Sequence, residues 1–193
     1  MIIRKLFKFE NAHIVRNCST QRCSQSLHGH SYKVEVLLQS SYLDEAQMIY
    51  DFGLTKLTIK DLIDAFDHSI TLWDKDKQEY ITDMKKHSQR WIVLPVSPSA
   101  EQFSRIIFLM VEKIIDATIM VNGERGVEVN SIIVHETDTG YAQSFKEDAH
   151  SQRMGAIDLQ AIEFSPQIQS EWSKSTLWSD ILEGKLIENP KKI

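Results

Sequence analysis

The chain has 193 residues, of which 42% are hydrophobic and 25% are charged, and its net charge at pH 7 is −5. This length fits one domain of ordinary size plus an extension, and the composition is that of a globular protein. A net negative charge provides no electrostatic attraction to the phosphates of a nucleic acid, so we expect no direct binding to DNA or RNA. Neither a run of about 20 apolar residues nor a secretory signal is found, so we expect a cytoplasmic protein that does not bind a membrane.

The first part of the chain predicts two strands joined by a polar loop. Alternation over residues 2–13 places Phe7 and His13 on one side of a strand, and residues 30–39 repeat this pattern. Residues 16–27 between them are polar and aperiodic, which is typical of a loop. Loops held by a rigid sheet often carry chemistry, so we expect functional residues here.

The middle of the chain predicts two helices and a further strand pair. Apolar residues at helical spacing predict a helix over residues 59–66, and a capping signal at Ser99 begins a second one. Residues 127–135 and 141–145 predict two strands joined by a hairpin turn. The mostly polar segment 73–96 is expected to be irregular. This order of elements favours an antiparallel sheet with helices on one face.

A pair of histidines gives the strongest local indication of chemistry. His28 and His30 are separated by one residue, so on an extended backbone they project to the same side and can bind one ion. His13 ends the first strand on its aromatic side, where an antiparallel neighbour could bring all three together. Three imidazoles without a fourth protein ligand describe an open zinc site. Alternatively, each histidine is an ordinary polar residue at a strand end or in a loop.

Cys23 lies five residues before His28, close enough to reach the neighbourhood of such a metal. As a fourth ligand it would close the site and make it structural. As a thiol beside the metal and a general base it would be catalytic, with a lowered pKa. Cys18 could instead be the reactive thiol, although the spacing favours Cys23, and either cysteine could be inert.

Three acidic or imidazole groups further along the chain are also candidates. Asp67 and His68 follow the first predicted helix, and together they could transfer protons, although such a pair also suits a helix end. Glu136 shares a strand face with Ile132 and Val134 and could point inward. An inward carboxylate could accept two parallel hydrogen bonds from the N–H pair of a pterin or guanine edge. The alternative is an exposed charge at a strand rim.

Six motifs taken together resemble, in order, those of the 6-pyruvoyl-tetrahydropterin synthase and 6-carboxy-tetrahydropterin synthase superfamily. They are Phe9-Glu-Asn-Ala-His13, Cys23 with Leu27-His-Gly-His30, Ile49-Tyr-Asp-Phe52, Phe66-Asp-His68, Pro98-Ser-Ala-Glu101 and Val134-His-Glu-Thr-Asp138. The resemblance implies an α+β tunnelling fold, with an antiparallel four-stranded sheet and two helices on one face. Subunits of this fold associate into a β-barrel, usually as a homohexamer with active sites between subunits.

The resemblance also implies a zinc-dependent lyase and a role for each candidate. By position, the zinc ligands are His13, His28 and His30, the catalytic groups are Cys23, Asp67 and His68, and the pterin anchor is Glu136. The implied substrate is 7,8-dihydroneopterin triphosphate. The carboxy branch converts it to 6-carboxy-5,6,7,8-tetrahydropterin, acetaldehyde and triphosphate on the way to queuosine, whereas the pyruvoyl branch only eliminates triphosphate. The Leu-His-Gly-His and Glu-Thr-Asp-Thr-Gly stretches favour the carboxy branch.

Two further interpretations complete the prediction. Residues 1–145 form the tetrahydropterin synthase-like domain, and residues 146–193 exceed the usual family length and form an extension of unknown role. A competing class is the cupins, all-β metal-binding proteins, because His28-x-His30 followed by Glu35 resembles their motif. Strand parity argues against it, since Glu35 faces away from His30 in an uninterrupted strand.

Overall fold

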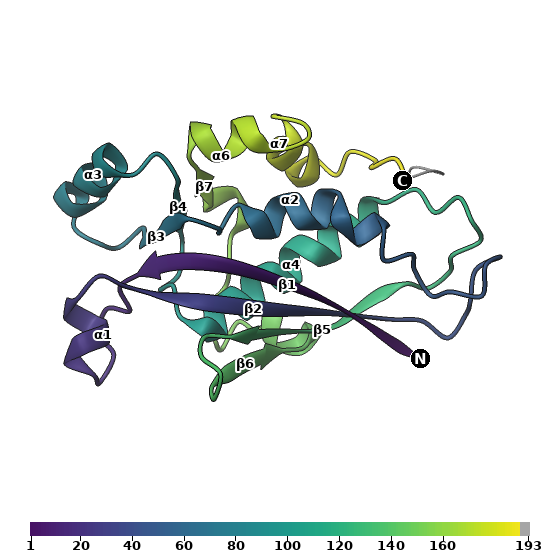
Figure 1. Cartoon of the computed structure of the whole chain (residues 1–193), viewed down its shortest axis with the longest axis horizontal. Helices are drawn as coiled ribbons and strands as arrows, with labels where there is room; N and C mark the ends of the chain where they lie inside the picture. Colours follow the sequence, from purple (N-terminus) through teal and green to yellow (C-terminus); the bar gives the residue numbers. More distant parts are fainter. Residues whose placement is uncertain (190–193) are drawn as a thin grey trace.

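The computed structural model describes residues 1–189, which fold around one seven-stranded sheet (Figure 1). The strands are β1 (Ile2–His13), β2 (His28–Gln39), β3 (Ser69–Trp73), β4 (Trp91–Leu94), β5 (Glu128–His135), β6 (Tyr141–Ser144) and β7 (Glu163–Phe164). Their order across the sheet is β6-β5-β2-β1-β3-β4-β7. β1 pairs with β2 along its full length and in antiparallel direction, whereas β3 runs parallel to both β1 and β4.

The predicted four-stranded antiparallel sheet is therefore wrong, although its four strands exist as β1, β2, β5 and β6. Beyond β1 the sheet continues through β3, β4 and β7. β3 and β4 are short, and both of their faces are buried. Ile70 and Leu72 pack with Ile81 of α3 on one face, while Ile92 packs into the main core on the other. Strands buried on both faces lack alternation, so the sequence pattern did not reveal them.

Seven helices and two short 3₁₀ turns accompany the sheet within residues 1–189. They are α1 (Gln21–Gln25), η1 (Leu54–Lys56), α2 (Thr58–Asp64), α3 (Gln78–His87), α4 (Ala100–Ala117), α5 (Lys146–Ala149), η2 (Leu159–Ala161), α6 (Pro166–Glu171) and α7 (Leu177–Leu182). The predicted cap of α4 is confirmed, because the Ser99 side chain accepts a hydrogen bond from the amide of Gln102. α2 and α4 cover one face of the sheet, whereas α3 covers the opposite face of β3 and β4. Along the described part of the chain, no helix combines the length and apolarity of a membrane span.

The segment after residue 145 packs into the same core as far as it is described. β7 pairs with β4, and the indole N–H of Trp172 donates to the carbonyl of Asp61 in α2. Arg105 of α4 is buried, and its guanidinium donates to backbone carbonyls on either side of a bend, at Asp148 and Gly155. These contacts join the predicted extension to α2 and α4, while the division of the chain at residue 145 stays a prediction.

A single chain forms an open sheet with β6 and β7 at its edges, not a barrel. The barrel that the resemblance implies would therefore require several chains to join their sheets edge to edge.

Candidate metal centre and active site

Three histidines converge where β1 ends and β2 begins. In the antiparallel register His13 lies opposite His28, and Asn11 lies opposite His30, so the three imidazoles share one face. One ring nitrogen from each histidine lies within 4.8 Å of those of the other two. His13 is fully buried, while the other two side chains are partly exposed. The predicted convergence is confirmed.

Two of these rings are bonded to the backbone through Nδ1, and Nε2 of His13 lies 3.4 Å from the Tyr32 hydroxyl. Nδ1 of His13 lies 2.5 Å from the carbonyl oxygen of Pro98, just before α4, and Nδ1 of His28 lies 2.9 Å from the carbonyl of Ser26. A ring that donates from Nδ1 presents the Nε2 lone pair to a cation. Burial lowers the pKa of His13 to about 4, although its bond to Pro98 opposes the shift, so this ring is neutral at neutral pH. Neutral imidazole is the form that binds a metal.

Glu136, the residue after β5, faces this cluster. Its Oε1 lies 3.8 Å from Nε2 of His13 and 3.9 Å from Nε2 of His30. The Tyr32 hydroxyl donates to the same oxygen at 3.2 Å. Burial and then the carboxylate of Glu136 raise the pKa of Tyr32 well above its ordinary range, so this phenol stays protonated and remains a donor. The carboxylate is therefore held toward the histidines, with a third of its side chain exposed.

Tyr32 was not predicted as a site residue. Its position two residues after His30 on the same strand face was the available indication, because alternate residues of a strand share a side. It lies opposite Phe9 in the β1–β2 register and stacks on that ring at 4.9 Å.

The three histidines fit a divalent cation that prefers nitrogen ligands. They offer three oriented imidazoles, with the burial of His13 on one side and the partial exposure of His28 and His30 on the other. Such a set leaves a coordination position open, as in catalytic zinc sites. Within the described residues, the only group of three or more close metal-binding side chains consists of these histidines. Cys23 is outside it, so the structure gives no support to a four-ligand structural site.

Cys23 lies in the short helix α1 rather than in an irregular loop, and its carbonyl accepts a hydrogen bond from the amide of Val15, just after β1, at 3.0 Å. Both cysteines are free and partly exposed. Burial raises the pKa of Cys23, and the neighbouring Cys18 and the carboxylate of Glu136 raise it further. The lowered pKa expected of a catalytic thiol is therefore not found, since the pKa of Cys23 is raised. The negative charge of Glu136 nevertheless acts on both the Cys23 thiol and the His13 ring, since it favours the protonated form of each.

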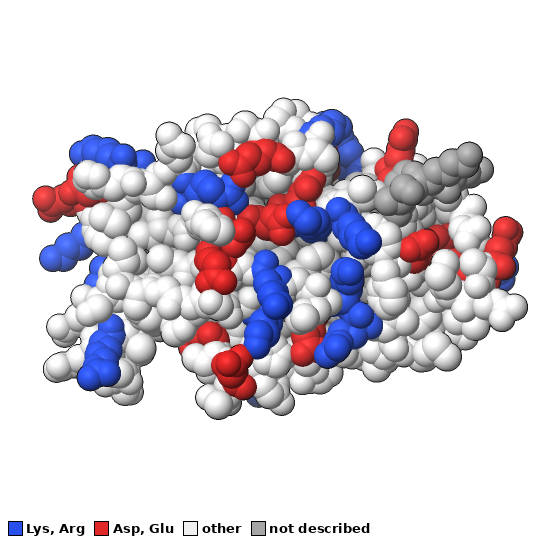
Figure 2. Space-filling model, in the orientation of Figure 1, with Lys and Arg blue, Asp and Glu red and all other residues white. Residues whose placement is uncertain are grey.

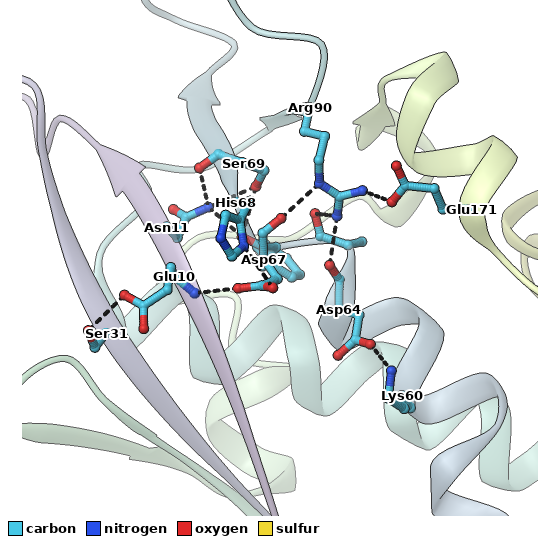
Figure 3. A network of polar contacts seen from close by, with 12 residues as sticks. Glu10, Asn11, Ser31, Lys60, Asp64, Asp67, His68, Ser69, Arg90 and Glu171 are labelled. Atoms are coloured by element: carbon cyan, nitrogen blue, oxygen red, sulfur yellow. Dashed lines mark hydrogen bonds and ion pairs between the residues drawn. The ribbon is translucent and has the colours of Figure 1, made fainter.

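Asp67 and His68 form a hydrogen-bonded pair beside β1 (Figure 3). One Asp67 oxygen accepts from the Glu10 amide at 2.7 Å, and the other lies 2.9 Å from Nδ1 of His68. Burial alone would raise the pKa of Asp67, yet these bonds lower it overall. The His68 side chain is 76% exposed. Among residues 1–189 no hydrogen bond or ion pair joins this pair to Cys23 or to the three histidines.

Two residues missed by the sequence analysis hold this pair in place. The amide of Asn11 donates to the carbonyl of Phe66 at 3.0 Å, which ties the turn to β1. Arg90 donates to the carbonyl of Asp67 at 2.8 Å and forms an ion pair with Glu171 of α6 (Figure 3). His68 itself has a φ of 50°, a conformation uncommon for a residue with a side chain, and the turn is fixed by these bonds.

The cupin alternative is wrong. The carboxylate of Glu35 binds Arg4 and His135 at 2.9 and 2.8 Å and lies on the face opposite to the three histidines. The mixed sheet with its long α4 is also not an all-β barrel.

Solved structures of tetrahydropterin synthases share this fold. The 6-pyruvoyl tetrahydropterin synthase of Plasmodium falciparum is 20% identical, with a TM-score of 0.56, and the match covers 75% of this chain and 98% of that one. The enzyme of the same name from Caenorhabditis elegans is 18% identical, with a TM-score of 0.52, over 75% of this chain and 94% of that one. These likenesses define the class of fold.

Sequence similarity identifies the family. The family model for 6-pyruvoyl tetrahydropterin synthase matches residues 2–147. The 6-carboxy-5,6,7,8-tetrahydropterin synthase of Helicobacter pylori strain J99 is 36% identical over 183 residues, which cover 94% of this chain and 92% of that protein. The protein of the same name from Aquifex aeolicus is 31% identical over 163 residues, covering 76% and 98%. The chain therefore belongs to the 6-pyruvoyl tetrahydropterin synthase family, on its 6-carboxy branch.

Proposed function

We propose that this protein is a 6-carboxy-5,6,7,8-tetrahydropterin synthase. It would act as a lyase that converts 7,8-dihydroneopterin triphosphate to 6-carboxy-5,6,7,8-tetrahydropterin, acetaldehyde and triphosphate, as a step toward queuosine. The observation that carries this proposal is a carboxylate, Glu136, directed at an open cluster of three histidines. The similarity to proteins of this name over nearly the whole chain supports it.

In this proposal each residue has a defined task. Zinc would be held by His13, His28 and His30, and it would supply Lewis acidity toward the substrate hydroxyls. Glu136, held by the Tyr32 hydroxyl, would accept two hydrogen bonds from the N–H pair of the pterin ring. Cys23 would move a proton at the substrate side chain. The burial of His13 keeps water from one side of the site.

The products decide between the two branches. Zinc-loaded protein incubated with 7,8-dihydroneopterin triphosphate is expected to release acetaldehyde and triphosphate in equal amounts, measured by mass spectrometry and phosphate analysis. Accumulation of 6-pyruvoyl-tetrahydropterin without acetaldehyde would support the pyruvoyl branch instead. Absence of any turnover by protein that contains zinc would refute both.

We further propose that the Asp67–His68 pair serves the Cys23 thiol of a neighbouring subunit, within a homohexamer. The exposed His68 ring and its lack of a hydrogen bond or ion pair with Cys23 among the described residues support this arrangement. Asp67 would fix the orientation of the ring, and the ring would exchange a proton with the thiol or the substrate.

Mixing two inactive variants tests whether the site is shared. Cys23→Ala and His68→Ala are each expected to be inactive, and subunit exchange between them should restore activity to about a quarter of the wild-type sites, since random pairing leaves that share intact. The matched control mixes Cys23→Ala with His28→Ala. These two residues belong to the same half of the site, so this mixture should stay inactive. Equal recovery in both mixtures, or in neither, contradicts the shared site.

A further inference from the structure

Cys18 has no task in the proposed function, yet it lies beside the cysteine that does. Both cysteines are free and partly exposed, and they are five positions apart in the sequence. Cys23 lies in α1, whereas Cys18 follows a turn in which Asn17 has a φ of 64°. Asparagine adopts this left-handed conformation more readily than most residues with a side chain. The turn bends the chain just before Cys18 and so returns it toward α1.

Two residues are hydrogen-bonded to both cysteines. The carbonyl of Thr20 accepts from the Cys18 thiol at 3.3 Å and from the Cys23 amide at 3.1 Å. On the other side, the Val15 amide donates to the Cys23 carbonyl at 3.0 Å, and the Val15 carbonyl accepts from the Cys18 amide at 3.5 Å. The sulfur of Cys18 and the amide of Cys23 thus contact one oxygen atom. These shared partners hold the two cysteines next to each other.

The two thiols also affect each other directly. Burial, and after it the Cys18 thiol, raise the pKa of Cys23, and a neighbouring thiol has such an effect only at short range. A disulfide needs two Cα atoms within about 4.4–6.8 Å of each other and side chains that point together. The shared hydrogen bonds keep the two backbones close, and the interaction of the thiols places both sulfurs on the same side.

The segment that carries the thiols is accessible and free to adjust. No residue of α1 is buried, and its N-cap, Thr20, makes no side-chain capping bond, so a small movement of α1 disrupts no core contact. Arg22 is the one charged residue between positions 17 and 27. At the lower left of Figure 2, where α1 projects, Lys or Arg side chains are visible but no Asp or Glu. This segment therefore does not repel a small anionic disulfide such as oxidised glutathione.

We propose that Cys18 and Cys23 form a reversible disulfide that inactivates the enzyme under oxidising conditions. The proposal rests on the proposed function, since it takes Cys23 as the group that moves a proton. Oxidation removes the proton and the free thiol from Cys23, while His13, His28 and His30 are unchanged. The site would keep its metal and lose its proton-transfer group.

The oxidant in this reaction is a small disulfide, RSSR, such as oxidised glutathione. The thiolate of one cysteine attacks RSSR, so that a mixed disulfide forms and one RS⁻ leaves. The thiolate of the other cysteine then attacks the protein sulfur of the mixed disulfide, and the second RS⁻ leaves. The two protons of the cysteine thiols end on the two released RSH molecules. The protein sulfurs are oxidised by two electrons, and RSSR is reduced by the same two.

A tryptic digest makes this disulfide directly observable. Trypsin cleaves after Arg22, between the two cysteines, and leaves them in separate peptides, 17–22 and 23–33. Full-length, zinc-loaded protein is treated with oxidised glutathione and digested without reduction. Mass spectrometry is expected to find the two peptides as one linked species that a reductant separates. Turnover should fall by about 10²–10⁴-fold, the usual contribution of a proton-transfer group, and return on reduction, while the zinc content stays constant.

The matched control is Cys18→Ser, which keeps Cys23 but removes its partner. This variant should have the basal turnover of the wild type and form no linked peptides, and after the same treatment its peptide 23–33 should carry glutathione. Oxidised wild-type protein should also migrate as a single chain on a non-reducing gel. Wild-type protein that carries glutathione on both peptides, or that is linked only between chains, would overturn the proposal.

Peptide mapping and turnover together separate this proposal from the proposed function. Linked peptides in a protein whose turnover is unchanged would show that the disulfide does not inactivate the enzyme, and the proposal would fail. Linked peptides in a protein that turns over no pterin even after reduction would leave the disulfide assignment standing, and the proposed function would fail instead.

Discussion

Replacing His28 by alanine is expected to abolish zinc binding and turnover while leaving the fold intact. The ring supplies one of three converging nitrogens, and its bond to the Ser26 carbonyl directs Nε2 at the cluster. Loss of a group that merely orients a ligand already weakens metal affinity by about 10–100-fold, and loss of the ligand itself should cost at least the upper figure. Because the side chain is partly exposed, its removal leaves no buried cavity.

Zinc content after dialysis, turnover, and thermal unfolding of the metal-free protein measure these three effects. The matched control is His135→Ala, a histidine that binds Glu35 on the opposite face of the sheet. It should keep its zinc and its activity. A His28→Ala protein that retains one tightly bound zinc per chain would show that the cluster is not the metal site.

The antiparallel half of the fold could be predicted because one of its faces is buried and the other is not. β1 and β2 alternate along twelve residues each, with Phe9 and Tyr32 inward and Lys8 and Lys33 outward. β3 and β4 carry no such alternation, since α3 covers the face that would otherwise be polar. The parallel half of the sheet depends on packing between distant segments, which no local pattern records.

The site was predictable to the extent that strand parity fixes it. Parity puts His28 and His30 on one side, and it turns Glu136 inward with Val134. Strand parity does not predict the conformation of the turn that carries His68, because this turn lies outside the strands. That turn is set by Asn11, through contacts more than fifty positions apart in the chain. Sequence patterns therefore predicted the metal cluster, but they did not predict that His68 forms no bond with the thiol of its own chain.

The Cys23→Ala variant is expected to keep its fold and its zinc and to lose turnover by about 10²–10⁴-fold, the usual contribution of a proton-transfer group. The thiol is partly exposed and lies in α1, outside the histidine cluster, so its removal takes no ligand from the metal and opens no cavity in the core. The expected loss therefore appears in kcat, with little change in the melting temperature or in zinc content.

The matched control is Cys18→Ala, which removes the other thiol of the segment between β1 and β2. Cys18 donates to the carbonyl of Thr20 at 3.3 Å, a local bond at the surface, so this variant should stay active. The reverse result, with Cys18→Ala inactive and Cys23→Ala active, would exchange the roles of the two thiols. Loss of zinc from Cys23→Ala would make the thiol a fourth ligand, which requires α1 to move toward the histidines. That movement would bring the thiolate against the carboxylate of Glu136, so the geometry of the site favours a thiol that stays off the metal.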